Sequence, residues 1–309
     1  MKFAFVFPGQ GSQSVGMMKG FDALSEVRDT FVEASDTLKV DLWQLVTEGP
    51  VEDLNKTLNT QPAMLAAGVA VHRAWHALGG GSATVMAGHS LGEYSALVAA
   101  GAMAFTDALP LVRFRAQAMQ DAVAEGVGGM AAILGLDDDV VRAMCAEAAQ
   151  GEVLEAVNFN SPGQVVIAGH KAAVERGCEL AKAKGAKRAL PLPVSVPSHC
   201  ALMKPAADRL ADYLKDVAIH APRVPVLQNA EVMSFNDGAA IKAALVKQLY
   251  QPVRWVETVQ KMGADGIGAA IECGPGKVLL GLNKRIVAEM KHYSLADQAA
   301  LEQALAETR

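Results

Sequence analysis

The sequence of 309 residues is poor in cysteine, in aromatic residues and in excess charge of either sign. The four cysteines are scattered and form no CxxC pair, which argues against a disulfide framework or a zinc site and fits a reducing cytoplasm. The 28 Lys and Arg against 33 Asp and Glu give a net charge of -5, which argues against a general binder of nucleic acid or membrane surfaces. No apolar run resembles a membrane span or a secretory signal. We therefore expect a cytoplasmic protein with no nucleic-acid or membrane partner.

Apolar residues make up 51% of the sequence, enough to bury a large core. Apolar strand patterns alternate with helical ones, and this alternation predicts an α/β protein with a mostly parallel sheet. The expected strands cover residues 2–7, 84–87, 224–227 and 266–272. The expected helices cover residues 21–38, 63–78, 90–101, 107–123, 202–214 and 239–250.

The middle of the chain follows a different pattern, between glycines near residue 126 and prolines near residue 191. Strands at 130–134, 153–157, 164–168 and 187–192, with helices at 137–149 and 171–184, give the order βαββαβ. That order is typical of a ferredoxin-like unit. We predict a small inserted subdomain at residues 126–196 within a larger domain formed by residues 1–125 and 197–309.

The strongest local motif is Gly88-His89-Ser90-Leu91-Gly92, which matches G-x-S-x-G. A predicted strand precedes it and a predicted helix follows, as in a nucleophile elbow. A tight turn there would expose the Ser90 hydroxyl, and free N–H groups beginning at Leu91 could face a developing oxyanion. The alternative is a serine that only caps the helix.

A serine nucleophile needs a base, and the chain has seven histidines. His199 lies in a loop that leaves the middle segment, where the returning chain could bring it over Ser90, although spacing alone leaves this open. Its reference pKa of about 6.5 predicts rates that fall at low pH. His72 and His76 have metal-ligand spacing but lack the glutamate of zinc proteases, so we expect no metal there. His89 is expected to point away from Ser90.

Two further features concern binding. Gly9-Gln10-Gly11 follows the first strand but lacks the third glycine of a dinucleotide fingerprint, so its N–H groups could instead complete an oxyanion hole. Arg115 and Arg113 lie on roughly opposite faces of a mostly apolar helix. A buried Arg115 would suit a substrate with a free carboxylate, and the alternative is a salt bridge to a nearby acid.

Five stretches together resemble the malonyl-CoA:acyl carrier protein transacylase family, in order and over nearly the whole chain, from about Lys2 to Ile286. They are Phe7-Pro8-Gly9-Gln10-Gly11-Ser12-Gln13, Gly88-His89-Ser90-Leu91-Gly92-Glu93-Tyr94, Asn160-Ser161-Pro162-Gly163-Gln164, Val196-Pro197-Ser198-His199 and Glu272-Cys273-Gly274-Pro275-Gly276-Lys277. The resemblance is to the free-standing enzyme of fatty-acid synthesis. It implies an α/β-hydrolase-like large domain with an inserted ferredoxin-like subdomain and a site in the cleft between them.

The resemblance also implies roles for individual residues. Ser90 would be the nucleophile, His199 the base, and Gln248 the residue whose backbone carbonyl orients the histidine. The N–H groups of Gln10 and Leu91 would form the oxyanion hole, and Arg115 and Asn160 would bind the substrate, with Arg115 on the malonyl carboxylate.

The implied reaction moves a malonyl group from malonyl-CoA to Ser90 and then to the phosphopantetheine thiol of acyl carrier protein, with no metal and no permanently bound cofactor. We expect a monomer. An acidic carrier protein would need local cations, for which the candidates are Lys182, Lys184, Lys187, Arg188, Lys277, Lys284 and Arg285.

Three alternatives remain. A polyketide-pathway acyltransferase shares every motif. A serine hydrolase would carry an Asp or Glu in a triad, and a non-catalytic carrier-protein binder would leave Ser90 unlabelled by acyl-CoA.

Overall fold

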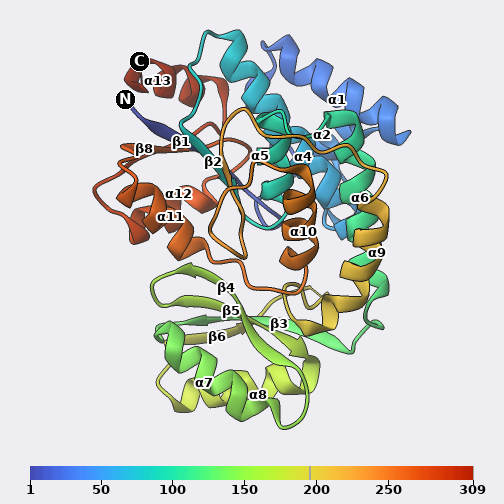
Figure 1. Ribbon diagram of the computed structural model, residues 1–309, viewed down its shortest axis with the longest axis vertical. Helices are drawn as coiled ribbons and strands as arrows, with labels where there is room; N and C mark the ends of the chain where they lie inside the picture. Colours follow the sequence, from blue (N-terminus) through green and yellow to red (C-terminus); the bar gives the residue numbers. More distant parts are fainter. Residues whose placement is uncertain (195, 309) are drawn as a thin grey trace.

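The computed structural model describes residues 1–194 and 196–308, so Ser195 and Arg309, which fall within the expected domain ranges, lie outside the described residues. The fold is mixed α/β, as predicted, and contains two sheets (Figure 1). One is a five-stranded parallel sheet of order β7-β2-β1-β8-β9, and the other is a four-stranded antiparallel sheet of order β4-β5-β3-β6. The described chain holds no helix long and apolar enough to cross a membrane.

The parallel sheet is covered on both faces, which explains the apolar character of its central strand. In β1, Phe3, Phe5 and Phe7 face one core cluster, which includes much of α4, whereas Ala4 and Val6 face a second cluster with residues of α11 and α12. Figure 1 shows α11 and α12 on one side of the sheet and α4, α5 and α6 on the other. The strands are β1 (Phe3–Phe7), β2 (Val85–Gly88), β7 (Val226–Leu227), β8 (Ala269–Glu272) and β9 (Lys291–Ser294).

The helices around this sheet differ in how far they are buried. Every residue of α4 from Thr60 to His72 is buried, and a helix that is apolar on all sides belongs in the interior. The helices are α1 (Ser25–Leu38), α2 (Leu42–Glu48), α3 (Val51–Leu54), α4 (Thr57–Ala77), α5 (Gly92–Ala99), α6 (Phe105–Asp121), α9 (Lys204–Leu214), α10 (Gly238–Gln248), α11 (Trp255–Ala264), α12 (Val278–Ile286) and α13 (Gln298–Thr308).

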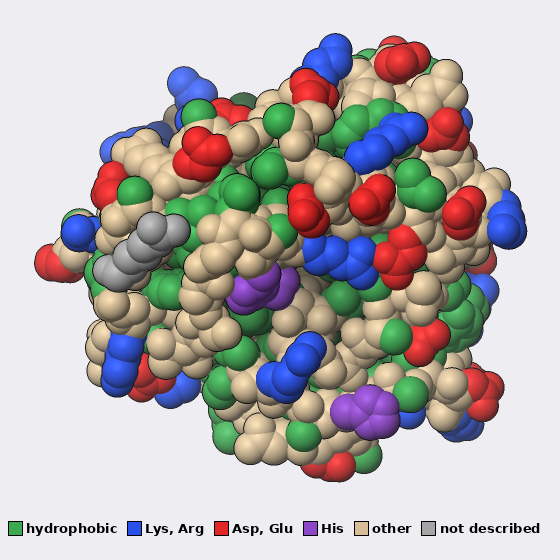
Figure 2. Space-filling view, turned by 90° about the horizontal axis from the view of Figure 1, so that it is seen from above, with side chains coloured by type: hydrophobic (Ala, Val, Ile, Leu, Met, Phe, Trp, Pro, Cys, Tyr) green, Lys and Arg blue, Asp and Glu red, His purple; other side chains and the backbone are tan. Residues whose placement is uncertain are grey.

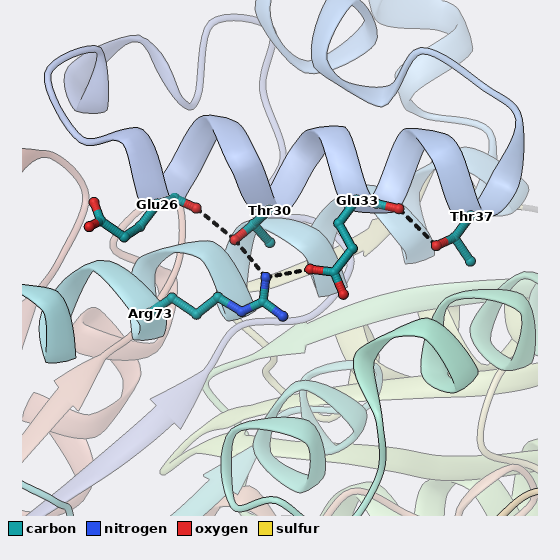
Figure 3. Close-up of polar contacts among 5 residues, drawn as sticks. All are labelled: Glu26, Thr30, Glu33, Thr37 and Arg73. Carbon is teal, nitrogen blue, oxygen red and sulfur yellow. Dashed lines mark hydrogen bonds and ion pairs between the residues drawn. The ribbon is translucent and has the colours of Figure 1, made fainter.

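A polar contact fixes the outer helix α1 to the central helix α4 (Figure 3). Arg73 on α4 donates to Thr30 Oγ1 at 3.1 Å and to Glu33 Oε2 at 2.7 Å. The hydroxyls of Thr30 and Thr37 in turn donate to the carbonyl oxygens of Glu26 and Glu33, one turn earlier in α1. The ion pair is about 40% exposed on both sides, so we assign it an orienting role and a stabilisation of only about 0–1 kcal/mol.

The antiparallel sheet has the element order β-α-β-β-α-β, as the sequence predicted. Its elements are β3 (Gly128–Leu134), α7 (Asp138–Ala149), β4 (Leu154–Ser161), β5 (Gln164–His170), α8 (Lys171–Ala183) and β6 (Arg188–Pro191). It has a core cluster of its own, to which α7 and α8 contribute. The backbones of β4 and the loop before α11 connect it to the rest of the chain, since Phe159 N–H donates to Val253 O at 3.0 Å and Val253 N–H donates to Val157 O at 2.8 Å.

Several elements differ from the sequence-based expectation. Helix α4 begins at Thr57, six residues before the expected start at residue 63, and β4 ends at Ser161, four residues beyond the expected end at 157. In the described chain, α2, α3, α11, β9 and α13 were not predicted at all, and α12 was expected only as a helix opened by the turn at Gly276-Lys277, without bounds.

Candidate active site

Ser90 lies in a sharp turn between β2 and α5, with a φ of 50° that is unusual for a residue with a side chain. A Cβ at Gly88 would overlap the backbone of Gly92, and a Cβ at Gly92 would overlap the carbonyl oxygen of Phe7. Both positions therefore require glycine. The strand, the turn and the helix have the geometry of a nucleophile elbow.

The Ser90 hydroxyl is hydrogen-bonded to an imidazole. Ser90 Oγ lies 2.7 Å from His199 Nε2, and His199 Nδ1 lies 2.7 Å from the carbonyl oxygen of Gln248. Because a carbonyl oxygen only accepts, Nδ1 must carry the proton, and Nε2 is left to accept from Ser90. Burial, and to a lesser extent the positive charge of Arg115, lower the pKa of His199 to about 3. The imidazole is therefore neutral at pH 7, which makes it a proton acceptor.

A buried guanidinium lies beside the same hydroxyl. Arg115 on α6 is 1% exposed, and its Nη2 lies 3.4 Å from Ser90 Oγ. Its Nη1 donates to Gln61 Oε1 and its Nη2 to Gln248 Oε1, each at 2.9 Å. Arg113 is exposed and donates to the backbone instead, so Arg115 is the inward-facing member of the pair. Within the described chain no carboxylate forms a salt bridge with Arg115, so the salt-bridge alternative is not realised.

The loop after β1 passes directly over the elbow. A Cβ at Gly9 would overlap the carbonyl oxygen of His89 and would lie 3.7 Å from the backbone nitrogen of Leu91. This contact brings Gln10 next to Leu91. The structure gives neither of their N–H groups an acceptor among the described residues. Both groups are therefore available to a negatively charged oxygen near Ser90.

These groups surround a cavity of about 330 Å³ that opens between the two sheets. The size suits an acyl group together with part of its carrier arm. Its lining is Gln10, Asn55, Lys56, Thr57, Gln61, His89, Ser90, Leu91, Arg115, Met119, Gln120, Met130, Asn158, Leu192, Pro193, Val194, Val196, Ser198 and His199. Gln248 lies behind this lining and contacts it through the hydrogen bonds given above.

Asn160 lies away from the cavity lining. Its Oδ1 is 2.8 Å from His89 Nε2, and the ring of His89 packs against Trp255 at 5.6 Å between centroids. His89 is thus bonded to β4 rather than to Ser90, in keeping with the expectation that it points elsewhere. Asn158 lines the cavity instead, and its buried Oδ1 has no partner among the described residues. A substrate contact by Asn160 stays a prediction.

The sequence analysis did not identify three buried polar residues of this site. Gln61 holds Arg115, Asn229 accepts a hydrogen bond from the Ser90 N–H, and Glu93 accepts one from Asn229. Glu93 directly follows the elbow motif and could have been noticed there. Asn229 follows a two-residue strand with no motif of its own, and nothing local indicates its role.

The remaining histidines and cysteines form no second site of this kind. His72 Nε2 and His76 Nε2 lie 3.2 Å apart, and burial lowers the pKa of His72 to about 3. In residues 1–194 and 196–308, no group of three His, Cys, Asp or Glu side chains could hold a metal ion. All four cysteines are free and buried.

A family model described as "Acyl transferase domain" matches residues 4–304. The chain belongs to the acyl transferase family. The malonyl CoA-acyl carrier protein transacylase of Salmonella typhimurium is 58% identical over 305 residues, which cover 98% of this chain and 99% of that protein. The Bacillus subtilis protein of the same name is 44% identical, over 98% of this chain and 96% of its own length. The family indicated by the sequence motifs is therefore confirmed.

Solved structures of family members agree over the full length. An acyl-carrier-protein S-malonyltransferase from Burkholderia pseudomallei is 61% identical, has a TM-score of 0.98, and covers 99% of this chain and 100% of its own. A malonyl-transacylase solved in complex with its type II polyketide-synthase acyl-carrier protein is 54% identical with a TM-score of 0.98, and the match covers 100% of both chains.

Proposed function

We propose that this acyltransferase moves a malonyl group from malonyl-CoA to the phosphopantetheine thiol of acyl carrier protein, by way of an ester on Ser90. One observation carries the proposal. The Ser90 hydroxyl oxygen lies 2.7 Å from a neutral imidazole nitrogen of His199 and 3.4 Å from the buried guanidinium of Arg115. The nucleophile Ser90 Oγ thus lies beside both a base and a cation that could bind a carboxylate. The names of the similar proteins support the same reaction.

The proposal includes a description of the fold. Residues 1–125 and 197–309 would form an α/β-hydrolase-like domain, and residues 126–196 would form a ferredoxin-like insert. The element order of the antiparallel sheet supports the ferredoxin-like insert. The path of the chain supports it too, since the chain leaves the larger domain after α6 and returns to it before α9. We also propose a monomer in the cytoplasm, where free cysteines are stable.

The first half-reaction acylates the serine. His199 Nε2 takes the Ser90 proton while Oγ attacks the thioester carbon, and the N–H groups of Gln10 and Leu91 stabilise the oxyanion that forms. The C–S bond then breaks, and the CoA sulfur leaves with the proton held by His199. The carbonyl of Gln248 keeps the imidazole oriented, a role that a carboxylate has in most serine hydrolases.

The second half-reaction reverses these steps with another thiol. The phosphopantetheine thiol gives its proton to His199 Nε2 and attacks the ester carbon of malonyl-Ser90. The C–O bond breaks, and Ser90 Oγ recovers the proton from His199. Every proton that leaves one thiol or hydroxyl is returned to another, so the proposal requires no metal and no bound cofactor.

Arg115 would select the acyl group. Gln61 and Gln248 hold the two ends of its guanidinium, which leaves N–H groups of a fixed planar fork for the malonyl carboxylate. Its positive charge lowers the pKa of His199 in the empty site. A bound carboxylate would offset that charge, and His199 would become a stronger base only when the acyl group carries the carboxylate.

An acidic carrier protein would dock on local cations. On the face shown in Figure 2, acidic and basic side chains are interspersed, and no broad field of one sign covers that face. Lys182 and Lys184 are engaged in salt bridges with Glu179 and Glu147. The other candidates, which are exposed and form no salt bridge within the described chain, are Lys187, Arg188, Lys277, Lys284 and Arg285.

A polyketide pathway is the second candidate, since one similar structure contains a type II polyketide-synthase carrier protein. The chemistry would be identical, and only the acceptor would differ. Transfer rates to a fatty-acid and to a polyketide carrier protein, measured side by side, distinguish the two.

Mass spectrometry after mixing with malonyl-CoA tests the function. We expect a malonyl adduct on Ser90 that disappears when holo-acyl carrier protein is added and malonyl-carrier protein forms. Ser90→Ala should abolish both products, whereas Ser95→Ala should not, since Ser95 is a buried serine of the following helix α5 whose hydroxyl has no partner in the described chain. Release of free malonate without transfer would indicate a hydrolase, and an unlabelled Ser90 would overturn the proposal.

A further inference from the structure

Side chains from distant segments bind three polar backbone groups of the turn at Ser90. The Ser90 N–H donates to Asn229 Oδ1 at 2.8 Å, and Asn229 Nδ2 donates to the carbonyl oxygen of Gly88 at 2.7 Å. Gln248 Nε2 donates to the carbonyl oxygen of Ser90 at 2.9 Å. A residue with a side chain and a φ of 50° is strained, and such strain persists only where its surroundings fix it. The amide of Asn229 bonds the turn on both sides of His89.

Asn229 is itself fixed by a buried acid. Its backbone N–H donates to Glu93 Oε2 at 2.7 Å, and both residues are at most 1% exposed. Glu93 Oε1 has no hydrogen-bond partner among the described residues. Burial raises the pKa of Glu93 to about 8, so the carboxyl is protonated at neutral pH. In this geometry Glu93 acts as a hydrogen-bond acceptor toward Asn229.

We propose that Asn229 and Glu93 are positioning residues for the reaction at Ser90: Asn229 holds the serine turn in its left-handed conformation, and Glu93 holds Asn229 through one carboxyl oxygen. This inference rests on the proposed role of Ser90 as the nucleophile. The arrangement keeps Ser90 Oγ at 2.7 Å from His199 and leaves the N–H of Leu91 without an acceptor among the described residues. A displacement of the hydroxyl by about 1 Å would lower the rate about 100-fold.

A small fluorophosphonate tests this step without CoA or a carrier protein, because it reacts only with an activated serine. Asn229→Ala should lower the rate of Ser90 labelling about 10- to 100-fold, and kcat for malonyl transfer by a similar factor. The KM for malonyl-CoA should change less than about threefold, since Asn229 does not line the cavity. The matched control is Asn283→Ala, which removes a buried amide that accepts from Trp255 Nε1 at 2.9 Å outside the cavity. It should lower the melting temperature and leave the labelling rate unchanged.

Asn229→Asp keeps the shape of the side chain, and it tests the positioning role of Asn229 even if Asn229→Ala does not fold. A protonated aspartic acid can accept from the Ser90 N–H and donate to the Gly88 carbonyl, whereas the ionised form would repel that carbonyl. The ratio of variant to wild-type labelling rates should therefore rise as the pH is lowered. The charged groups near this site, Glu93, Glu231 and Arg115, are common to both proteins, so the ratio isolates position 229.

The acceptor role of Glu93 has its own test. Glu93→Leu should lower the labelling rate as Asn229→Ala does, and Glu93→Gln should restore most of that loss, since an amide oxygen also accepts a hydrogen bond. If Glu93→Gln is as slow as Glu93→Leu, the charge matters and the inference is wrong.

Two results separate this inference from the proposed function. Folded Asn229 variants that react like the wild type, at a rate ratio independent of pH, would overturn the inference while malonyl-Ser90 still forms. A wild-type protein that reacts with the fluorophosphonate but takes no malonyl group would overturn the proposed function, and the labelling rates of the variants would still decide the inference.

Discussion

Replacing Arg115 by alanine should convert a malonyl-selective site into one that discriminates little between malonyl and acetyl groups. The two groups differ by one carboxylate, and the buried guanidinium of Arg115 is the cation beside the reacting hydroxyl, at 3.4 Å. Two charge-assisted hydrogen bonds to the carboxylate would contribute about 3–5 kcal/mol together. At about 1.4 kcal/mol per tenfold, this corresponds to a preference of about 100-fold to several thousand-fold.

The magnitude follows from what Arg115 contacts when no carboxylate is bound. Its two Nη atoms already donate to Gln61 and Gln248, so an acetyl group leaves the guanidinium as it is in the empty site. An acetyl group therefore makes no hydrogen bond to Arg115, whereas the malonyl carboxylate would make both charge-assisted hydrogen bonds. Arg115→Ala should therefore lower kcat/KM for malonyl-CoA by about 100-fold or more and lower the malonyl-to-acetyl ratio by a similar factor. Arg115→Lys should restore malonyl transfer only in part, because an ammonium lacks the planar fork.

The assay is transfer from malonyl-CoA and acetyl-CoA to holo-acyl carrier protein, with the acyl-Ser90 adducts quantified by mass spectrometry in a single turnover. Arg113→Ala is the matched control, since Arg113 lies two residues away on the same helix and is exposed. It should leave the ratio nearly unchanged. An unchanged ratio in Arg115→Ala, or a shifted one in Arg113→Ala, would refute the assignment of the cation.

Two further predictions concern pH and salt. Because burial lowers the pKa of His199 to about 3, the base is neutral above that value, and kcat/KM should stay level from about pH 8 to about pH 5 and fall only below. This differs from the expectation based on the reference pKa, and an acid limb near pH 6.5 would show that burial does not shift the base. Added salt should raise the KM for the carrier protein more than the KM for a pantetheine thiol. Charge reversal of Lys187 and Arg188 should have the same effect. The control is Lys215→Glu, at a lysine that pairs with Asp212. Equal salt effects on both acceptors would contradict docking by these cations.

The parts of the fold that could be predicted from the sequence are those with a strong local pattern. The middle segment consists of short apolar runs and helical stretches separated by glycines and prolines, so its six elements were predicted in the right order. The elbow was predicted because glycine is required at both Gly88 and Gly92, and this requirement is written in the motif itself.

Three of the elements that were not predicted lack such a pattern, whereas α11 has one, with Trp255, Val256, Val259 and Met262 buried along one face, and was missed. Strand β9 at Lys291–Ser294 is largely polar and lies at the edge of the sheet, where it pairs only with β8. Helix α3 has only four residues, and the seven of α2 barely reach two turns, too short for a helical period to show. These elements form because the larger structure supports them, and that support is not visible in a short window of sequence.

The site shows the same limit more sharply, because contacts between distant residues build it. Gln248 lies 158 residues from Ser90, yet its carbonyl holds His199, its amide oxygen holds Arg115, and its amide nitrogen holds the Ser90 backbone. Arg115 and His199 are therefore hydrogen-bonded to one residue. If Arg115 binds the malonyl carboxylate as proposed, that contact would act on the same residue that holds His199 and the Ser90 backbone, and recognition of the malonyl group would be coupled to activation of the serine.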